Sequence, residues 1–421
     1  MRSIGKCAVS LVLSLVVVLA LAGVAGAKVS IRIQDWRLAE KPAGPSLEGI
    51  IQAFEKENPD IEVVLDAVSV NDKLQKFVTQ SRGGDPPDVV RILTTDVPGW
   101  VDMGLLLPLD SLVAKAGGKE FLKDFSPFLV KAMTIKGKLY GIPNEGDALV
   151  IYYNADLFKQ AGLNPDKPPK TFDEFIEASK KLTRPAEGRW AFGMLAHPSI
   201  ANIWMQSWFL ANGSDFFNDD YTDTLVDSKA GIEAFKFYVE LYTKYGVVPP
   251  GPTDVDYAAE VNLFSQQKVA MVVGPFATYG GILAANPALK GKVRMMAFPG
   301  KVKTSSGRGT VFSIATGSKH QAEAFKLIEF INRPDSQLKF YREATMMPTR
   351  LSVFKSKAVA GDPEITVMLD AIETATTYPI YVKWSEANRI LVDALHAALL
   401  KVKTPEQAAR EAGQAIRALM K

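Results

Sequence analysis

The feature that most constrains the fold is an alternation of strand-like and helix-like segments that begins at residue 29. Apolar residues alternate with polar ones from Val29 to Ile33, which is typical of a half-buried strand. A helical pattern follows over residues 47–54, and we expect Ser46 to cap this helix and Asn58-Pro59 to end it. Strands that alternate with helices predict a mostly parallel sheet covered on both faces, the α/β class. In such sheets a ligand binds outside the carboxyl ends of the strands.

The alternation continues along a chain that is too long for one hydrophobic core. At 421 residues two or three packing units are expected, since a domain averages roughly 150 residues. A second α/β unit begins near residue 150, and Thr171 with Glu174 forms a capping box at its first helix. The stretch 304–309 is the best candidate for a flexible loop or a crossing point. Further predicted elements are strands at 61–65, 89–93, 150–153 and 269–273, and helices at 72–80, at 325–331 and from Pro405 onward.

The first 27 residues have the pattern of a secretion signal. Met1 to Lys6 carry positive charge, Ala8 to Ala22 is almost wholly apolar, and Ala25-Gly26-Ala27 supplies the small residues that signal peptidase accepts. We therefore expect cleavage after Ala27 and a secreted protein, in the periplasm or at the extracellular face of the membrane. The alternative is an uncleaved membrane anchor, because the apolar run approaches the roughly 20 residues that span a bilayer. The only cysteine, Cys7, lies in this leader, so no disulfide or cysteine nucleophile is expected.

Charge and histidine content argue against several classes of function. Lys and Arg number 49 against 46 Asp and Glu, so the basic excess that nucleic-acid binding needs is missing. The histidines His197, His320 and His396 are far apart and form no metal-binding or triad pattern, so no metal and no cofactor are expected. The Asp-rich stretch 215–227 lacks the glycine and final glutamate of a calcium loop and is predicted to be a turn and strand pair. Nothing indicates the carboxylate pair of a secreted glycosidase.

Aromatic residues near strand ends suggest a sugar. A neutral sugar has flat C–H faces that favour aromatic rings, and hydroxyls that favour carboxylates, amides and arginine. Trp36 directly follows the first strand, so it stands at the carboxyl edge of the sheet, although plain packing is the alternative. Trp204 and Trp208 are four residues apart and share one helix face, a spacing more typical of a core stripe.

Sequence blocks in a fixed order resemble family 1 extracellular solute-binding proteins, the maltose-binding-protein-like receptors of bacterial and archaeal ABC importers. The resemblance covers essentially the whole chain after residue 27. No single block is decisive, but the succession is. The blocks are Gly83 to Val90, Val101 to Leu109, Tyr140-Gly141-Ile142-Pro143, Tyr152-Tyr153-Asn154, Ala161-Gly162-Leu163, Pro168 to Phe175, Gln267 to Met271 with Gly274-Pro275-Phe276, Phe298-Pro299-Gly300, Ser318-Lys319-His320, Met347 to Arg350 and Lys403 to Glu406.

The resemblance implies two α/β lobes of the type II periplasmic-binding-protein-like fold, with a ligand cleft between them. Crossing hinge strands are expected to join the lobes, and the ligand-closed form would be recognised by the permease subunits of an ABC importer. We expect a monomer. The implied division is an N-terminal lobe of residues 28–143 and 312–375, a C-terminal lobe of 147–308 and 379–421, and hinges near 143–147, 309–312 and 376–379.

The resemblance also implies aromatic ligand contacts. Trp384 lies where similar proteins have a stacking tryptophan, and family position favours Trp204 over Trp208 as the residue that reaches the ligand. Phe276 matches the aromatic residue that follows the Gly-Pro pair, and Tyr279 is three residues further on. For Phe276 and Tyr279 core packing is the alternative.

Polar ligand contacts are likewise implied by the resemblance. Asp147 is seven residues before Asn154 and aligns with an acidic ligand contact, with Glu145 as the fallback. Thr95 and Asp96 stand where maltose-binding relatives have an acidic and a basic residue, a departure that weakens any case for maltose specificity. Arg350 resembles an arginine that forks onto sugar hydroxyls, with a surface salt bridge as the alternative.

The sequence therefore predicts a receptor, not an enzyme, that captures a small mono- or oligosaccharide and delivers it to a membrane permease. A receptor for a polyamine or a glycerol phosphate is the alternative, and a secreted glycosidase is less favoured. A ferric-ion receptor would need clustered tyrosinates, whereas Tyr152 and Tyr153 point to opposite faces of one strand.

Overall fold

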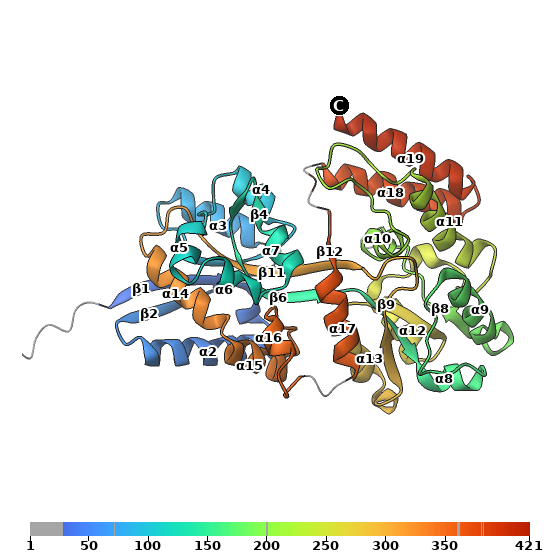
Figure 1. Ribbon diagram of the computed structural model, residues 1–421, viewed down its shortest axis with the longest axis horizontal. Helices are drawn as coiled ribbons and strands as arrows, with labels where there is room; N and C mark the ends of the chain where they lie inside the picture. The colour runs from blue at the N-terminus through green and yellow to red at the C-terminus, as the bar shows by residue number, and fades with distance from the viewer. Residues whose placement is uncertain (1–27, 71, 199–200, 360–362, 380, 382) are drawn as a thin grey trace, which may run out of the picture.

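The computed structural model describes residues 28–70, 72–198, 201–359, 363–379, 381 and 383–421. The predicted leader, residues 1–27, lies outside the described residues. Two α/β lobes lie side by side and are joined by extended strands (Figure 1). Within the described ranges, no helix is both long enough and apolar enough to span a bilayer.

The N-terminal lobe is built on a mostly parallel sheet. Strand β1 (Val29–Asp35) lies between β2 (Ile61–Ala67) and β3 (Val89–Leu93), and both pairings are parallel. Strand β11 (Ser306–Ile314) adds to β3 in antiparallel orientation. This arrangement confirms the α/β class. The helices of this lobe are η1 (Trp36–Ala39), α2 (Ala43–Glu57), α3 (Lys73–Arg82), α4 (Val97–Asp102), α5 (Asp110–Lys115), α6 (Lys119–Lys123), α7 (Pro127–Ala132), α14 (Gln321–Ile331), α15 (Pro334–Ala344) and α16 (Leu351–Phe354).

Helix α2 covers this sheet and begins earlier than predicted. Its apolar face, including Leu47 and Phe54, is fully buried, and the helix ends at Asn58 as expected. The prediction that Ser46 caps it is wrong, because the helix starts at Ala43 and Ser46 is buried within its first turns. Pro45 does not prevent the earlier start, since the first backbone N–H groups of a helix have no intrahelical partner to lose.

The C-terminal lobe has a mixed sheet in the order β10-β7-β9-β8. Strand β7 (Val150–Asn154) is antiparallel to β9 (Val269–Gly274) and β10 (Val293–Met296), whereas β8 (Trp190–Phe192) is parallel to β9. The helices are α8 (Ala155–Gln160), η2 (Pro185–Glu187), α9 (Phe172–Leu182), α10 (Ala201–Ala211), α11 (Lys229–Thr243), η3 (Pro252–Asp254), α12 (Tyr257–Ser265), α13 (Ala277–Ala285), η4 (Pro287–Leu289), α18 (Trp384–Leu399) and α19 (Pro405–Met420).

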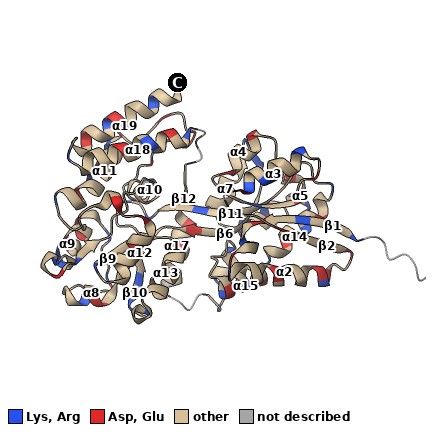
Figure 2. Cartoon of the chain, turned by 180° about the vertical axis from the view of Figure 1, so that it is seen from behind, with Lys and Arg blue, Asp and Glu red and all other residues tan. Residues whose placement is uncertain are grey.

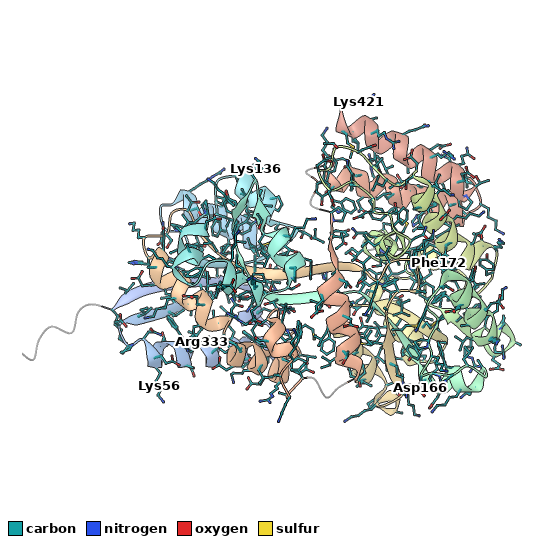
Figure 3. All side chains as sticks on the ribbon, viewed as in Figure 1. Lys56, Lys136, Asp166, Phe172, Arg333 and Lys421 are labelled. Carbon is teal, nitrogen blue, oxygen red and sulfur yellow. The ribbon has the colours of Figure 1, made fainter. Side chains whose placement is uncertain are left out.

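The cap of helix α9 and the Asp-rich stretch 215–227 both differ in detail from the sequence prediction. At the start of α9, Thr171 Oγ1 accepts a hydrogen bond from Glu174 N at 3.2 Å, but the Glu174 carboxylate reaches Lys170 N, one residue before the cap. Phe172, labelled in Figure 3, opens α9 and stacks on Phe237 with ring centroids 3.8 Å apart. The Asp-rich stretch 215–227 forms turns with a single bridge between Phe217 and Thr224, not a pair of strands.

The lobes are joined by strands whose two faces differ in chemistry. Strand β6 (Ile142–Ala148) runs antiparallel to β11, with Gly146 opposite Gly309 and Asp147 opposite Arg308. A Cβ added at Gly309 would lie 2.5 Å from the carbonyl oxygen of Glu145, so only glycine fits on this closely packed face. Because side chains alternate along a strand, Arg308 and Asp147 share the opposite face. In Figure 2 charged residues are visible on these strands between the lobes.

A third connection runs beside these strands. Helix α17 (Pro363–Thr374) leads into β12 (Thr376–Thr377), which pairs in parallel with Ser306 and Gly307 of β11. The crossings predicted near 143–147, 309–312 and 376–379 lie on or next to these elements. The lobe boundaries drawn from them remain a prediction.

Candidate ligand-binding site

A recess lies where the crossing strands meet the C-terminal lobe. Its lining combines charged and aromatic side chains from segments that are far apart in the sequence. Two of the predicted site residues, Asp147 and Trp204, line it together, and Arg308 and Tyr378 lie beside them. The remaining lining residues are Ala148, Leu149, Ile203, Pro275, Ser306 and Gly307.

One carboxylate oxygen of Asp147 is held by backbone N–H groups, and the other has no bond to the described residues. Oδ1 accepts hydrogen bonds from Phe276 N and from Ala148 N, both at 3.0 Å. Oδ2 accepts no hydrogen bond from any residue that the structure describes. Burial raises the pKa of Asp147 to about 6, against the opposing effect of the Arg308 charge. At neutral pH the carboxylate is therefore ionised and can accept a hydrogen bond from a ligand hydroxyl.

Two aromatic pairs flank this carboxylate. The Trp204 ring is buried, and its Nε1 donates to Val273 O at 3.0 Å, which fixes the ring. Tyr257 meets it edge-on, with centroids 6.0 Å apart at 65°. Tyr378 makes a similar T-shaped contact with Trp384, at 5.1 Å and 80°. Trp384 itself does not line the recess but supports Tyr378, which does.

Phe276 and Tyr279 contribute less directly. The Phe276 ring is buried in an apolar cluster and stacks with Tyr341 at 6.5 Å, so core packing describes its side chain while its backbone N–H serves Asp147. Tyr279 is partly buried against the same cluster. The sequence signal at the Gly-Pro turn therefore locates the site through the backbone at Phe276.

Two predicted acids, Glu145 of β6 and Asp96 at the start of α4, are paired with basic side chains. Glu145 accepts from Arg37 Nη2 through both oxygens, at 2.8 and 2.7 Å. Asp96 forms an ion pair with Lys73 at 3.0 Å, and the same ammonium lies 5.8 Å from the centre of the Trp36 ring. Thr95 is half-buried in the turn after β3, and Trp36 is almost fully buried.

Beneath these residues a buried ion pair ties the strands together. Arg91 and Asp35 are both fully buried, and Nε donates to Oδ2 at 2.7 Å. Arg91 Nη1 also donates to Asn144 Oδ1 and Thr310 Oγ1. Burial raises the pKa of Asp35, and the Arg91 charge opposes this effect. One guanidinium thus connects β1, β3, β6 and β11.

The structure does not bring Arg350 to the recess. Its Nη1 donates to Asp124 Oδ2 at 3.0 Å, its Nε donates to Asn332 O, and its guanidinium lies 4.3 Å from the centre of the Phe125 ring. These partners belong to the N-terminal lobe, where Arg350 fixes the start of α16. The predicted fork onto sugar hydroxyls is therefore replaced by a partly buried ion pair.

Three lining or supporting residues were not predicted. Arg308 lies between Gly307 and Gly309, and Tyr378 follows β12 directly. The Gly-Arg-Gly pattern is a possible signal, because small residues in a strand mark a closely packed face and leave the intervening side chain on the other. Tyr257 begins α12 after its Asp256 cap and carries no sequence signal of its own.

The metal-ligating residue types and the two adjacent tyrosines of β7 are placed as follows. No group of three His, Cys, Asp or Glu in the described part of the chain could hold a metal ion. The hydroxyls of Tyr152 and Tyr153 donate to Pro275 O and Pro165 O at 2.9 and 2.7 Å, and their rings belong to different apolar clusters, as their opposite faces predict.

Comparison with known proteins gives a consistent picture. The family model described as bacterial extracellular solute-binding protein matches residues 39–338. A putative binding protein of Brucella abortus is 26% identical over 380 residues, covering 90% of each chain. The maltodextrin-binding protein MdxE of Bacillus subtilis is 25% identical over 381 residues, covering 83% of this chain and 82% of MdxE.

A solved structure extends the comparison to the fold. An ABC transporter solute-binding protein from Thermotoga lettingae, bound with α-D-tagatose, is similar with a TM-score of 0.75 at 26% identity, covering 94% of this chain and 100% of that chain. The chain therefore belongs to the bacterial extracellular solute-binding protein family and has its two-lobe type II periplasmic binding fold.

Proposed function

We propose that this protein is the substrate-binding receptor of an ABC importer and that it captures a small neutral carbohydrate between its lobes. The main support for the proposal is the chemical composition of the recess. An open carboxylate oxygen of Asp147 and the guanidinium of Arg308 lie beside the rings of Trp204 and Tyr378. A sugar matches this set, because its hydroxyls both donate and accept while its C–H faces pack on rings.

The charges around the recess favour a neutral ligand. Glu145, Asp96 and Asp35 each have a basic partner, so none of them offers an uncompensated charge to a solute. Two relatives are linked to neutral carbohydrates, since the Thermotoga protein was solved with tagatose and the Bacillus relative is named for maltodextrin. We propose Trp36, Thr95, Asp96 and Glu145 as contacts that approach the ligand when the lobes close.

The same arrangement supports the proposal of binding without catalysis. A glycosidase needs two functional carboxyl groups about 5 to 9 Å apart on either side of the bond. Among the residues that the structure describes, Asp147 is the only acid that lines the recess, and both oxygens of the neighbouring Glu145 accept from Arg37. The ligand would therefore leave chemically unchanged, and the membrane permease of the importer is the proposed recipient.

A thermal-shift panel tests the ligand class. Purified protein lacking residues 1–27 is mixed with mono- and disaccharides, with spermidine and with glycerol 3-phosphate. A sugar at about 100 times its dissociation constant stabilises the folded protein by about 2.7 kcal/mol and raises its melting temperature. Stabilisation by spermidine or glycerol 3-phosphate alone would contradict the proposal, and product formation from any sugar would favour an enzyme.

A further inference from the structure

Arg308 is an exposed basic residue placed at the centre of the molecule. It lies on β11 directly opposite Asp147 of β6. Its side chain is exposed, and its guanidinium makes no ion pair or hydrogen bond with the residues that the structure describes. A side chain with several N–H donors and no acceptor among the described residues, in a recess where the crossing strands meet the C-terminal lobe, has its bonding capacity available for a solute.

The strands hold Arg308 on the recess side. Gly307 and Gly309 occupy the other face, where a Cβ at Gly307 would lie 2.7 Å from Ala375 Cβ and 3.0 Å from the Phe128 ring. The packed face therefore cannot accept a large side chain, and the alternation of the strand places Arg308 opposite to it. Its charge lowers the pKa values of Asp147 and Tyr378, which line the recess, and of Tyr257, which packs against Trp204.

Asp147 and Arg308 thus offer complementary halves of one polar contact. Asp147 Oδ2 accepts, Arg308 donates, and neither group is consumed by the other, since no hydrogen bond or ion pair joins them in the described structure. A ligand with adjacent hydroxyls can donate to the carboxylate and accept from the guanidinium at once. A ligand that carries a net charge would meet one attractive group and one repulsive group.

We propose that the Asp147–Arg308 pair is the specificity-determining element that selects uncharged sugars over their acidic and amino derivatives. The inference rests on the proposed function and names the solute class of that site. A uronic acid is attracted by Arg308 but repelled by Asp147, and an amino sugar meets the reverse situation. Removing one member of the pair should therefore change which charged derivative is tolerated.

The test compares nine ligands, in three matched sets, on wild type and two variants. Glucose, galactose and mannose, each with its uronic acid and its 2-amino-2-deoxy derivative, are titrated by calorimetry against wild type, Asp147→Asn and Arg308→Gln. Asn keeps an oxygen that can accept from Phe276 N and Ala148 N, and Arg308 is exposed, so both variants should fold. Melting curves without ligand verify this.

Each variant is expected to bind one charged derivative better, relative to the neutral sugar, than wild type does. Wild type binds the neutral sugar best. Asp147→Asn improves the affinity ratio of uronic acid to neutral sugar by about tenfold, and Arg308→Gln does so for the amino sugar, since each loses its repulsive partner. The double substitution Asp166→Asn with Arg294→Gln removes a surface ion pair of the same chemistry in the C-terminal lobe and should change no ratio.

Two outcomes would overturn the inference, and they can be told apart. Unchanged ratios in both variants, with neutral sugar still bound by wild type, would show that the pair does not sort ligands by charge. Failure of wild type to bind any of the nine sugars, with spermidine or glycerol 3-phosphate bound instead, would overturn the proposed function and the inference with it.

Discussion

At the scale of single residues, Asp147 has a distinctive ionisation. Its pKa is raised by burial to about 6, with Arg308 acting in the opposite direction and Glu145 in the same direction. The other groups that face this region, Tyr257 and Tyr378, have pKa values raised by burial and are neutral at these pH values. The open oxygen of Asp147 is thus a charged acceptor above pH 6 and loses its negative charge below it.

We therefore predict that sugar affinity is constant near pH 8 and falls as the pH decreases through about 6. Protonation replaces a charge-assisted hydrogen bond, worth about 1.5 to 3 kcal/mol, by a weaker neutral one. Calorimetric titrations between pH 5 and 8 measure this, and Asp147→Asn should bind more weakly with little pH dependence. A wild-type affinity that does not change across this range would argue against Asp147 as a ligand contact.

The buried pair of Arg91 and Asp35 supports a prediction about stability. In Arg91→Met the Asp35 carboxylate stays buried without its cation, which typically costs about 3 to 5 kcal/mol. Urea unfolding followed by circular dichroism measures the loss. Arg294→Met is the matched control, because Arg294 and Asp166 are exposed and such pairs are worth about 0 to 1 kcal/mol. Equal effects of the two substitutions would show that the buried network is not a stabilising feature.

At the scale of elements, the crossing strands depend on glycine. We predict that Gly309→Ala destabilises the protein by about 1 to 3 kcal/mol, since its Cβ would lie 2.5 Å from Glu145 O and 2.6 Å from Leu129 Cδ2. Gly280→Ala in α13 is the control, because a Cβ there meets nothing within 4 Å. That control should be neutral or stabilising by up to about 1 kcal/mol. Urea unfolding midpoints of the two variants measure the difference in stability. A Gly309→Ala variant as stable as wild type would mean that the crossing strands can move apart to accept the methyl group.

Much of the element order was predictable because it depends on local patterns. The strands predicted at 61–65, 89–93, 150–153 and 269–273 all fall within strands of the structure, since a buried strand is recognisable from its own apolar run. The stretch 304–309 could only be described as a loop or a crossing. Its strand begins at Ser306 because β6 and β12, which pair with it, come from distant parts of the chain.

The candidate site was less predictable than the fold. Asp147 and Trp204 were found by family position and do share the recess. Arg308 was not found, because an exposed arginine becomes significant only through its register opposite Asp147. The sequence resemblance predicts that Arg350 contacts the ligand, whereas in the structure Arg350 donates to Asp124, which is more than 200 residues away in sequence. Long-range pairing of charges cannot be read from one sequence.

At the scale of the whole molecule, the arrangement predicts a change of shape. A ligand held by Asp147 and Trp204 that also reaches Trp36 and Asp96 stabilises a state in which the lobes are closer. Small-angle X-ray scattering should therefore show a smaller radius of gyration when the sugar identified by the thermal panel is added. Asp147→Asn at the same sugar concentration should show a smaller change. An unchanged radius in saturated wild type would exclude closure as the response to binding.

The central claim is that a neutral sugar is bound intact between the lobes at the Asp147–Arg308 pair. A crystal structure of the wild-type protein with the sugar identified by the thermal panel would show directly whether this is so. We expect density for one intact sugar whose hydroxyls contact Asp147 Oδ2 and the Arg308 guanidinium, with Trp204 or Tyr378 against its face. A sugar bound elsewhere, or bound between the lobes without contact to either Asp147 or Arg308, would contradict it.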